Sequence, residues 1–237
     1  MLSANDIQPN PLAEARGVER VYRLRSEEVH ALRGIDLAVW PGEFVALIGR
    51  SGSGKTTLLN ILAGLDRPTG GQAFIRGREI TGLPEAELAA LRRETLGFVF
   101  QSFALLPLLT AFENVELPLR ILGWPRGERE RRAREALEMV GLPHRAKHRP
   151  YELSGGEQQR VAIARAIAPR LPAIFADEPT GELDSNTGQS IFQLFRALVT
   201  QEKVALLVAT HDRAIIRQAD RVLELRDGAL TEQVRAG

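Results

Sequence analysis

Cysteine is absent from this chain of 237 residues, and tryptophan and tyrosine each occur only twice. Without cysteine the protein can form neither disulfide bonds nor thiolate metal sites, which suits a reducing compartment. An excess of charge of one sign is also missing, because 31 Lys and Arg side chains stand against 30 Asp and Glu side chains. Nucleic-acid binders carry a strongly basic footprint, so we expect no nucleic-acid partner.

Long apolar runs are missing as well. No run approaches the roughly 18 consecutive apolar residues of a membrane-spanning helix, and the N-terminus lacks the charged-then-apolar pattern of a signal peptide. The chain is therefore not expected to cross a membrane. Its length suits one large α/β domain with an inserted piece. We predict a loose tail over residues 1–16, which contain Pro9 and Pro11, and a single domain over residues 17–237.

Short apolar runs alternate with helical patterns along that domain. The runs predict strands at Val18–Tyr22, Ile35–Val39, Phe44–Ile48, Ala73–Ile75, Gly77–Ile80, Leu96–Phe100, Ala173–Ala176, Val204–Ala209 and Arg221–Leu225. Apolar periodicity predicts helices at Lys55–Ala63, Ala111–Leu122, Glu128–Val140, Gly156–Ala168 and Ser190–Thr200. Apolar strands interleaved with helices indicate a parallel sheet covered on both faces. Residues 103–170 hold no such strand, so we predict an inserted α-helical subdomain there.

A glycine-rich run at Gly49–Thr56 fits the G-x-x-x-x-G-K-[ST] pattern of a P-loop. A predicted strand precedes it and a predicted helix follows it, which argues against a chance match in a glycine-rich turn. Backbone N–H groups of such a loop cradle phosphate oxygens, while Lys55 would reach the β and γ phosphates and Thr56 would bind Mg²⁺. The residues expected to bind nucleotide here are Gly49, Arg50, Ser51, Gly52, Ser53, Gly54, Lys55, Thr56 and Thr57.

A second phosphate-binding signal lies further along the chain, in the Leu-Ser-Gly-Gly-Glu-Gln-Gln-Arg run of Leu153–Arg160. A helical pattern follows this Ser-Gly-Gly turn directly. A single nucleotide needs only one P-loop, so the second turn suggests that each triphosphate is gripped from two sides. The residues expected to take part are Ser154, Gly155, Gly156 and Glu157.

Two adjacent carboxylates, Asp177 and Glu178, follow the apolar run Ala173–Ala176. Ligands of open α/β sheets gather at the carboxyl ends of the strands, where Asp177 is placed to hold Mg²⁺. Neighbouring side chains on a strand point in opposite directions, so Glu178 is expected to be the general base or to orient the attacking water. Taken alone the pair is equally an ordinary strand end capped by acids, and the P-loop favours the metal site.

Two further polar residues end predicted strands. His211 is either a structural histidine or a partner of the γ-phosphate or the attacking water, and the sequence alone leaves both interpretations open. Gln101 is either a Mg²⁺ or water ligand or a strand-end glutamine without a chemical role. We include both among the candidate catalytic residues, and Gln101 also among the metal ligands with Thr56 and Asp177.

The motifs together resemble those of the ATP-binding-cassette (ABC) ATPases, and the resemblance covers residues 17–232. It matches Gly49–Thr56 to the Walker A loop, Ala173–Glu178 to the Walker B strand, Leu153–Gln158 to the signature motif, Gln101 to the Q-loop, Glu182–Asp184 to the D-loop and His211 to the switch histidine. Tyr22 resembles the aromatic residue that stacks on adenine, although a tyrosine packed in the core is the alternative. The implied fold class is α/β, a P-loop NTPase core with an antiparallel β subdomain and an inserted α-helical subdomain.

Finer detail resembles the branch that includes the macrolide-exporter and lipoprotein-release ATPases. The runs that carry this resemblance are Val29–Asp36, Gly97–Phe103 and Glu113–Pro118. One residue departs from the branch, because Glu182 stands where asparagine is usual after Asp-Glu-Pro-Thr-Gly. The resemblance implies ATP and Mg²⁺ as cofactors and a head-to-tail homodimer that holds two ATP molecules. It also implies integral membrane permease partners, at the cytoplasmic side of the cell membrane.

Three functions are compatible with these features. The main prediction is an ATP-hydrolysing subunit that powers export or extraction of a substrate by a separate membrane complex. The alternative is an ATPase that regulates a membrane partner controlling cell-wall hydrolysis, without transport. A cassette acting on DNA or ribosomes is disfavoured, because long heptads, a second cassette and a basic balance are missing from the sequence. The apolar run Phe103–Leu109 is either part of the helical core or the permease-docking surface.

Overall fold

The computed structural model describes residues 10–23 and 27–234. Most of the expected N-terminal tail therefore lies outside the described residues. Its predicted end is wrong, because strand β1 (Ala13–Arg23) begins within the range assigned to the tail. Leu12, Ala13 and Ala15 are buried, and burial of these apolar side chains stabilises an early start of the strand.

A six-stranded sheet forms the centre of the molecule, with the strand order β10-β9-β3-β8-β7-β6. Its strands are β3 (Phe44–Ile48), β6 (Leu96–Val99), β7 (Ala173–Asp177), β8 (Ala205–Ala209), β9 (Arg221–Arg226) and β10 (Ala229–Val234). All neighbouring strands pair in parallel except β9 and β10, which form an antiparallel hairpin. The predicted parallel sheet is present, and the antiparallel hairpin turns at Asp227 and Gly228.

Side chains of the central strands alternate between two apolar cores. In β3, Phe44 and Ala46 belong to one core, whereas Val45 and Leu47 belong to the other. Strands β7 and β8 divide in the same way, since successive side chains of a strand point to opposite faces. Nearly every residue of these strands is buried. This explains why their sequences are continuous apolar runs without polar alternation.

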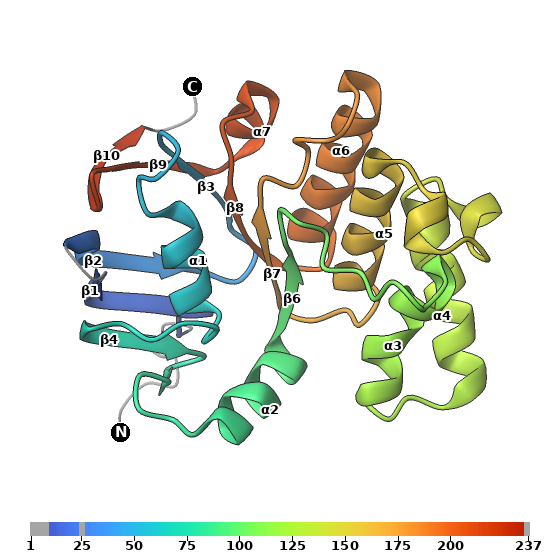
Figure 1. Ribbon diagram of the computed structural model, residues 1–237, viewed down its shortest axis with the longest axis horizontal. Coiled ribbons are helices and arrows are strands. Elements are labelled where there is room, and N and C mark those ends of the chain that lie inside the picture. Colours follow the sequence, from blue (N-terminus) through green and yellow to red (C-terminus); the bar gives the residue numbers. More distant parts are fainter. Residues whose placement is uncertain (1–9, 24–26, 235–237) are drawn as a thin grey trace, which may run out of the picture.

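The N-terminal part of the chain forms the antiparallel sheet that the fold class predicts. Its order is β2-β1-β4-β5, with β2 (Glu28–Val39), β4 (Gly70–Ile75) and β5 (Arg78–Glu79) beside β1. Helix α1 (Lys55–Leu62) shares one core with both sheets and lies between them. Figure 1 shows this arrangement on the side of the molecule that carries the N-terminus. The P-loop helix is therefore held by both sheets.

Helices cover the other face of the central sheet. Between β6 and β7 the chain forms α3 (Ala111–Ile121), α4 (Arg126–Met139) and α5 (Gly155–Ile167), and α6 (Ser185–Gln201) and α7 (Arg213–Gln218) follow later. In Figure 1, α3 and α4 lie on the far side of α5 from the sheet. Close backbone approach fixes α5, because a Cβ at Gly97 of β6 would lie 2.5 Å from the carbonyl oxygen of Ala166.

Two helices were not predicted, and a third is longer than predicted. Helix α2 (Glu85–Thr95) was not predicted, since only Leu88 and Thr95 of its residues are buried and its apolar stripe is short. Helix α7 was also missed, and at six residues it is too short to show a period. Helix α6 starts before the predicted Ser190, because Asp184 caps it by accepting hydrogen bonds from Asn186 N and Thr187 N.

Candidate functional site

The glycine-rich run Gly49–Gly54 forms the turn between β3 and α1, as predicted for a P-loop. Its glycines are required by the backbone, since Gly49, Gly52 and Gly54 have φ angles of 153°, 78° and 105°. Space is equally restrictive. A Cβ at Gly54 would lie 2.4 Å from the carbonyl oxygen of Ala31, and one at Gly49 would lie 2.3 Å from that of Leu225. Larger residues would therefore distort the loop at the start of α1.

The side chain of Lys55 folds back over this loop. Its Nζ donates hydrogen bonds to the carbonyl oxygens of Gly49 at 2.9 Å and Arg50 at 3.1 Å. Lys55 is 9% exposed, and it still lines the hollow above the loop. An ammonium group held there places a positive charge beside the loop's N–H groups and the α1 N-terminus, an arrangement that favours a phosphate.

Thr56, the second residue of α1, joins the P-loop to β7. Its hydroxyl donates to Asp177 Oδ2 at 2.6 Å. Asp177 ends β7 and is 4% exposed. Burial raises the pKa of Asp177, the nearby Glu178 charge raises it too, and the Thr56 hydroxyl and Lys55 lower it. A buried carboxylate paired with a hydroxyl provides two oxygen donors of the kind that Mg²⁺ prefers.

Glu178 and His211 meet above the ends of β7 and β8. The ring Nδ1 of His211 lies 3.1 Å from Glu178 Oε1 and 3.0 Å from Oε2. Because an ionised carboxylate only accepts, Nδ1 carries the proton and Nε2 is left for another partner. Glu178 was expected to continue the strand, but β7 ends at Asp177 and Glu178 has a φ of 47°. This left-handed conformation is uncommon for a non-glycine residue and typical of functional sites.

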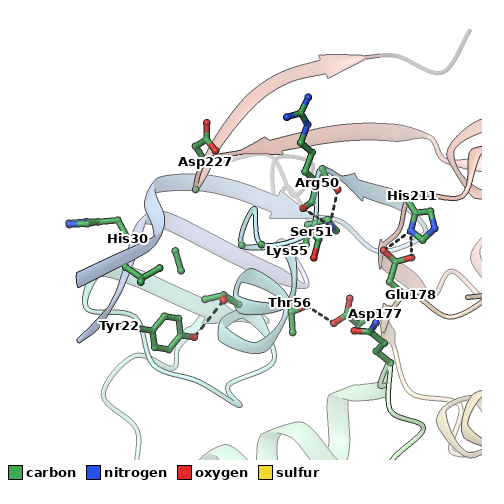
Figure 2. Close-up of a pocket in the computed structure, with 18 of the residues that line it drawn as sticks. Tyr22, His30, Arg50, Ser51, Lys55, Thr56, Asp177, Glu178, His211 and Asp227 are labelled. Carbon is green, nitrogen blue, oxygen red and sulfur yellow. Dashed lines mark hydrogen bonds and ion pairs between the residues drawn. The ribbon is translucent and has the colours of Figure 1, made fainter. Parts of the chain in front are cut away.

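These residues surround a hollow of about 980 Å³, which we name the first hollow (Figure 2). The predicted site residues that line it are Tyr22, Gly49, Arg50, Ser51, Gly52, Gly54, Lys55, Thr56, Thr57, Gln101, Asp177, Glu178 and His211. Ser53 is buried, with 7% exposed, and does not line the first hollow. Sequence reasoning missed His30, Arg33 and Asp227, which also line it and come from β2 and the β9–β10 turn.

Residues Ser154, Gly155, Gly156 and Glu157 line a different hollow of about 650 Å³, which we name the second hollow. Ser154 caps α5 in a capping box. Its Oγ accepts from Glu157 N at 3.2 Å, and Glu157 Oε2 accepts from Ser154 N at 2.9 Å. Arg145 holds the other oxygen of Glu157 at 2.8 Å. Hydrogen bonds from the Ser154 N–H and Arg145 keep the pKa of Glu157 below its usual value.

Glu182 lines both hollows. Its Oε2 lies 3.3 Å from the position that a Cβ at Gly155 would take, and its carbonyl oxygen lies 2.9 Å from such a position at Gly156. The two glycines therefore allow the segment that carries Glu182 to approach the start of α5. The residue that departs from the branch pattern lies at this close contact.

The segment after Gln101 connects the first hollow to the helices. Phe103 and Ala104 have left-handed φ angles of 61° and 48°. Arg165 of α5 donates to both of their carbonyl oxygens, at 2.9 and 2.5 Å. The fully buried Asn114 of α3 accepts from Leu106 N at 2.8 Å and donates to Leu106 O at 3.2 Å. The segment is thus bonded to two helices.

A glycine loop between a strand and a helix, with its threonine bonded to the acid at the end of another strand, defines the P-loop nucleoside-triphosphatase class. Within that class the chain belongs to the ABC transporter family and is an ABC ATPase cassette. The family model described as ABC transporter matches residues 32–181. The predicted fold class and the predicted ATPase activity are confirmed.

Two relatives identify the branch. The lipoprotein-releasing system ATP-binding protein LolD 2 of Caulobacter vibrioides is 48% identical over 224 residues, which cover 94% of this chain and 98% of that protein. The macrolide export ATP-binding/permease protein MacB of Wolinella succinogenes is 49% identical over 94% of this chain. The match covers only 34% of MacB, so the chain spans about a third of that relative. The predicted macrolide-export and lipoprotein-release branch is confirmed.

A solved structure has the same fold. It is a dimeric post-hydrolysis state of the ATP-binding cassette MJ0796 bound to ADP and Pi, with a TM-score of 0.92 and 43% sequence identity. The match covers 95% of this chain and 99% of that one. Among the described residues, no helix is long and apolar enough to cross a membrane.

Proposed function

We propose that two copies of this chain form a head-to-tail dimer that hydrolyses ATP and drives separate membrane permease subunits in export or extraction of a substrate. The observation that carries this proposal is the separation of the two phosphate-binding signals. Within the described part of the chain, Ser154, Gly155 and Gly156 line the second hollow and not the first. In a head-to-tail dimer the second hollow of one subunit would face the first hollow of the other and complete its site.

The first hollow fits ATP and Mg²⁺. The phosphates would bind the loop Gly49–Thr56 and Lys55. The residues proposed to hold the cation are Thr56, Asp177 and Gln101, whose side chains offer a hydroxyl, a carboxylate and an amide oxygen. Bound Mg²⁺ neutralises developing phosphate charge. Burial disfavours the charged form of Asp177 and raises its pKa, and a cation held at this position would favour that charged form.

Glu178 is the proposed general base. Its carboxylate would accept a proton from the attacking water, and the hydrogen bond to His211 would hold it in position. His211 is 79% exposed on its side chain, so its Nε2 remains accessible for the γ-phosphate or the water. Tyr22 lines the first hollow apart from the phosphate loop, and we assign its ring to the adenine.

The relatives support transport as the process that ATP drives. MacB is named as a combined ATP-binding and permease protein, and LolD 2 as the ATP-binding protein of a lipoprotein-releasing system. Both names favour transport over the regulation of cell-wall hydrolysis. Because the match covers 98% of LolD 2, which is named as an ATP-binding protein, we propose that the partner is a separate permease chain at the membrane and that the cassette binds its cytoplasmic side.

Replacing Glu178 with glutamine tests the proposal. The amide cannot accept a proton from water, so Glu178→Gln should bind ATP but hydrolyse it at least about a hundredfold more slowly. It should also accumulate as a closed dimer, visible by gel filtration with Mg-ATP. A control is Glu94→Gln, which removes an exposed carboxylate that lines neither hollow and should hydrolyse ATP like the wild type. A variant that stays monomeric with bound ATP would contradict the sandwich, and wild-type hydrolysis would remove Glu178 as the base.

A further inference from the structure

We propose that Asp66 is a positioning residue that fixes the Tyr22 ring for stacking on the adenine base. The inference deepens the proposed function, because it rests on ATP binding in the first hollow with Tyr22 as its base platform. Asp66 lies in the turn after α1, and it does not itself line the first hollow among the residues that the structure describes. Its influence on the nucleotide would pass through Tyr22.

One carboxylate holds both the tyrosine and an arginine. The Tyr22 hydroxyl donates to Asp66 Oδ2 at 2.8 Å. Arg20 donates to the same carboxylate from two nitrogens, Nε at 3.0 Å and Nη2 at 2.8 Å. The bidentate pair is only about one fifth exposed on each side, at 21% for Arg20 and 23% for Asp66. Charge-assisted bonds of this geometry are strong and directional.

The arginine also covers the ring. The guanidinium carbon of Arg20 lies 4.4 Å from the centroid of the Tyr22 ring, which is a cation–π contact. Arg20 does not line the first hollow, whereas Tyr22 does. The ring face that carries Arg20 is therefore turned away from the hollow, and the opposite face is the one that we assign to a planar base.

The same contacts connect the platform to the phosphate loop. The Tyr22 hydroxyl lies 3.5 Å from the hydroxyl of Thr57, on the first turn of α1 (Figure 2). Asp66 follows the end of α1, and the next turn returns to β1, where Thr69 Oγ1 accepts from Val21 N at 3.1 Å. The ring is thus fixed relative to the helix that begins at Lys55. An ATP whose base stacks on Tyr22 and whose phosphates bind the loop would require these two parts to keep a fixed relative position.

A purely structural salt bridge is the competing explanation, and the same sheet offers a matched control. Glu14 accepts two hydrogen bonds from Arg16, at 2.7 and 2.9 Å. The guanidinium of Arg16 lies 4.4 Å from the ring centroid of Phe74. This cluster has the same acid, arginine and aromatic composition, but none of its members lines the first hollow. Glu14→Ala therefore reports the cost of losing such a cluster away from the nucleotide.

Titration calorimetry with two probes tests the inference on the full chain. ATP contains the base, and inorganic tripolyphosphate lacks it. We expect Asp66→Ala to raise the Kd for ATP about tenfold, within the range of one base-stacking contact, and to leave the Kd for tripolyphosphate unchanged. Turnover at saturating ATP should persist. Glu14→Ala should change neither Kd. In a Tyr22→Ala background, Asp66→Ala should add no further loss of ATP affinity.

Each contrary result has a distinct meaning. An equal rise of both Kd values would show that Asp66 supports the phosphate loop, and an unchanged ATP Kd would show that the ring does not depend on it; either overturns the inference. If wild-type protein binds ATP no better than tripolyphosphate, or Tyr22→Ala has no effect, the base platform of the proposed function fails as well. If Asp66→Ala does not fold, Asp66→Asn and Tyr22→Phe carry the test, and both should weaken ATP binding alone.

Discussion

Lys55 is the residue whose charge the phosphate site most depends on. Its ammonium group is held over the loop by the carbonyl oxygens of Gly49 and Arg50. Lys55→Ala removes that charge, so we expect the Kd for ATP, measured by calorimetry, to rise at least about tenfold. The exposed Lys147 serves as a control, and Lys147→Ala should bind ATP like the wild type. Equal affinity of the Lys55 variant and the wild type would contradict the P-loop assignment.

Asp177 illustrates a conflict between stability and function at the same residue. Burial raises its pKa, so the ionised form is disfavoured in the folded protein relative to the unfolded chain. A group with a raised folded-state pKa contributes stability below its unfolded pKa, and that contribution is lost as pH rises through the folded pKa. The Asp177→Asn side chain does not ionise, so the variant does not lose this stability as pH rises. Its amide oxygen can still accept the hydrogen bond from the Thr56 hydroxyl.

We therefore expect Asp177→Asn to unfold at a higher temperature than the wild type without nucleotide, with a difference that grows from acidic to neutral pH. The same variant should lose Mg²⁺-dependent ATP hydrolysis. Thermal denaturation over a pH series, together with a phosphate-release assay, measures both effects. A variant that is less stable than the wild type at neutral pH would show that the carboxylate has compensating partners in the folded protein.

At the scale of the element, α5 is capped at its N-terminal end by Ser154, the part of the proposed ATP site that the partner subunit would use. Because Ser154 and Lys55 line different hollows, Ser154→Ala should impair hydrolysis and leave ATP binding by a monomer largely intact. Loss of the cap also removes one hydrogen bond at the helix start, at a cost of about 1 kcal/mol. Ser154→Gly separates the two effects, because glycine is tolerated at the first capping position of a helix although the serine hydroxyl is lost.

Mixing inactive variants distinguishes sites within one chain from sites shared between chains. A mixed dimer of Lys55→Ala and Ser154→Ala subunits has one site with both changes and one site with neither. We expect ATPase activity to reappear when the two purified variants are combined, as measured by phosphate release. If Ser154 acts on the nucleotide of its own chain, the mixture will stay as inactive as its components.

How far the sequence predicts the structure depends on the range of the interaction. The P-loop, the start of α5 and the apolar strands are local patterns, and each was placed close to its observed position. The contact between Tyr22 and Asp66 joins residues 44 positions apart, and no local pattern indicates it. The left-handed turn at Glu178 was missed for a related reason, because β7 and β8 together set that backbone, through the hydrogen bond from Glu178 N to Ala209 O.

At the scale of the whole molecule, the apolar run Phe103–Leu109 remains the predicted permease contact. Leu108 is 81% exposed and Leu106 is 45% exposed. The backbone of this run is held at Ala104 by Arg165 and at Leu106 by Asn114, while the two leucine side chains lie outside the core. An exposed apolar surface on an ordered segment is suited to binding another protein.

Replacing Leu106 and Leu108 with glutamine should weaken co-purification with the tagged permease and spare ATP binding. Leu65 has a similar exposure of 43% and lies after α1, so Leu65→Gln is the control and should recover the permease in full. A folded double variant that binds ATP and still recovers the permease in full yield would exclude this surface.

Arg165 connects helix α5 to the segment that follows Gln101. The guanidinium of this α5 residue is bonded to the backbone that follows Gln101, and Gly97 brings β6 against the adjacent Ala166 at the same C-terminal end of the helix. A displacement of the backbone at Gln101 would therefore shift α5 as a rigid body, and Ser154 at its N-terminal end would move with it. In the proposed dimer, Ser154 of one subunit would contact the nucleotide of the other. The movement of α5 would therefore couple the Gln101 segment of each subunit to the presence of ATP in the other subunit's P-loop.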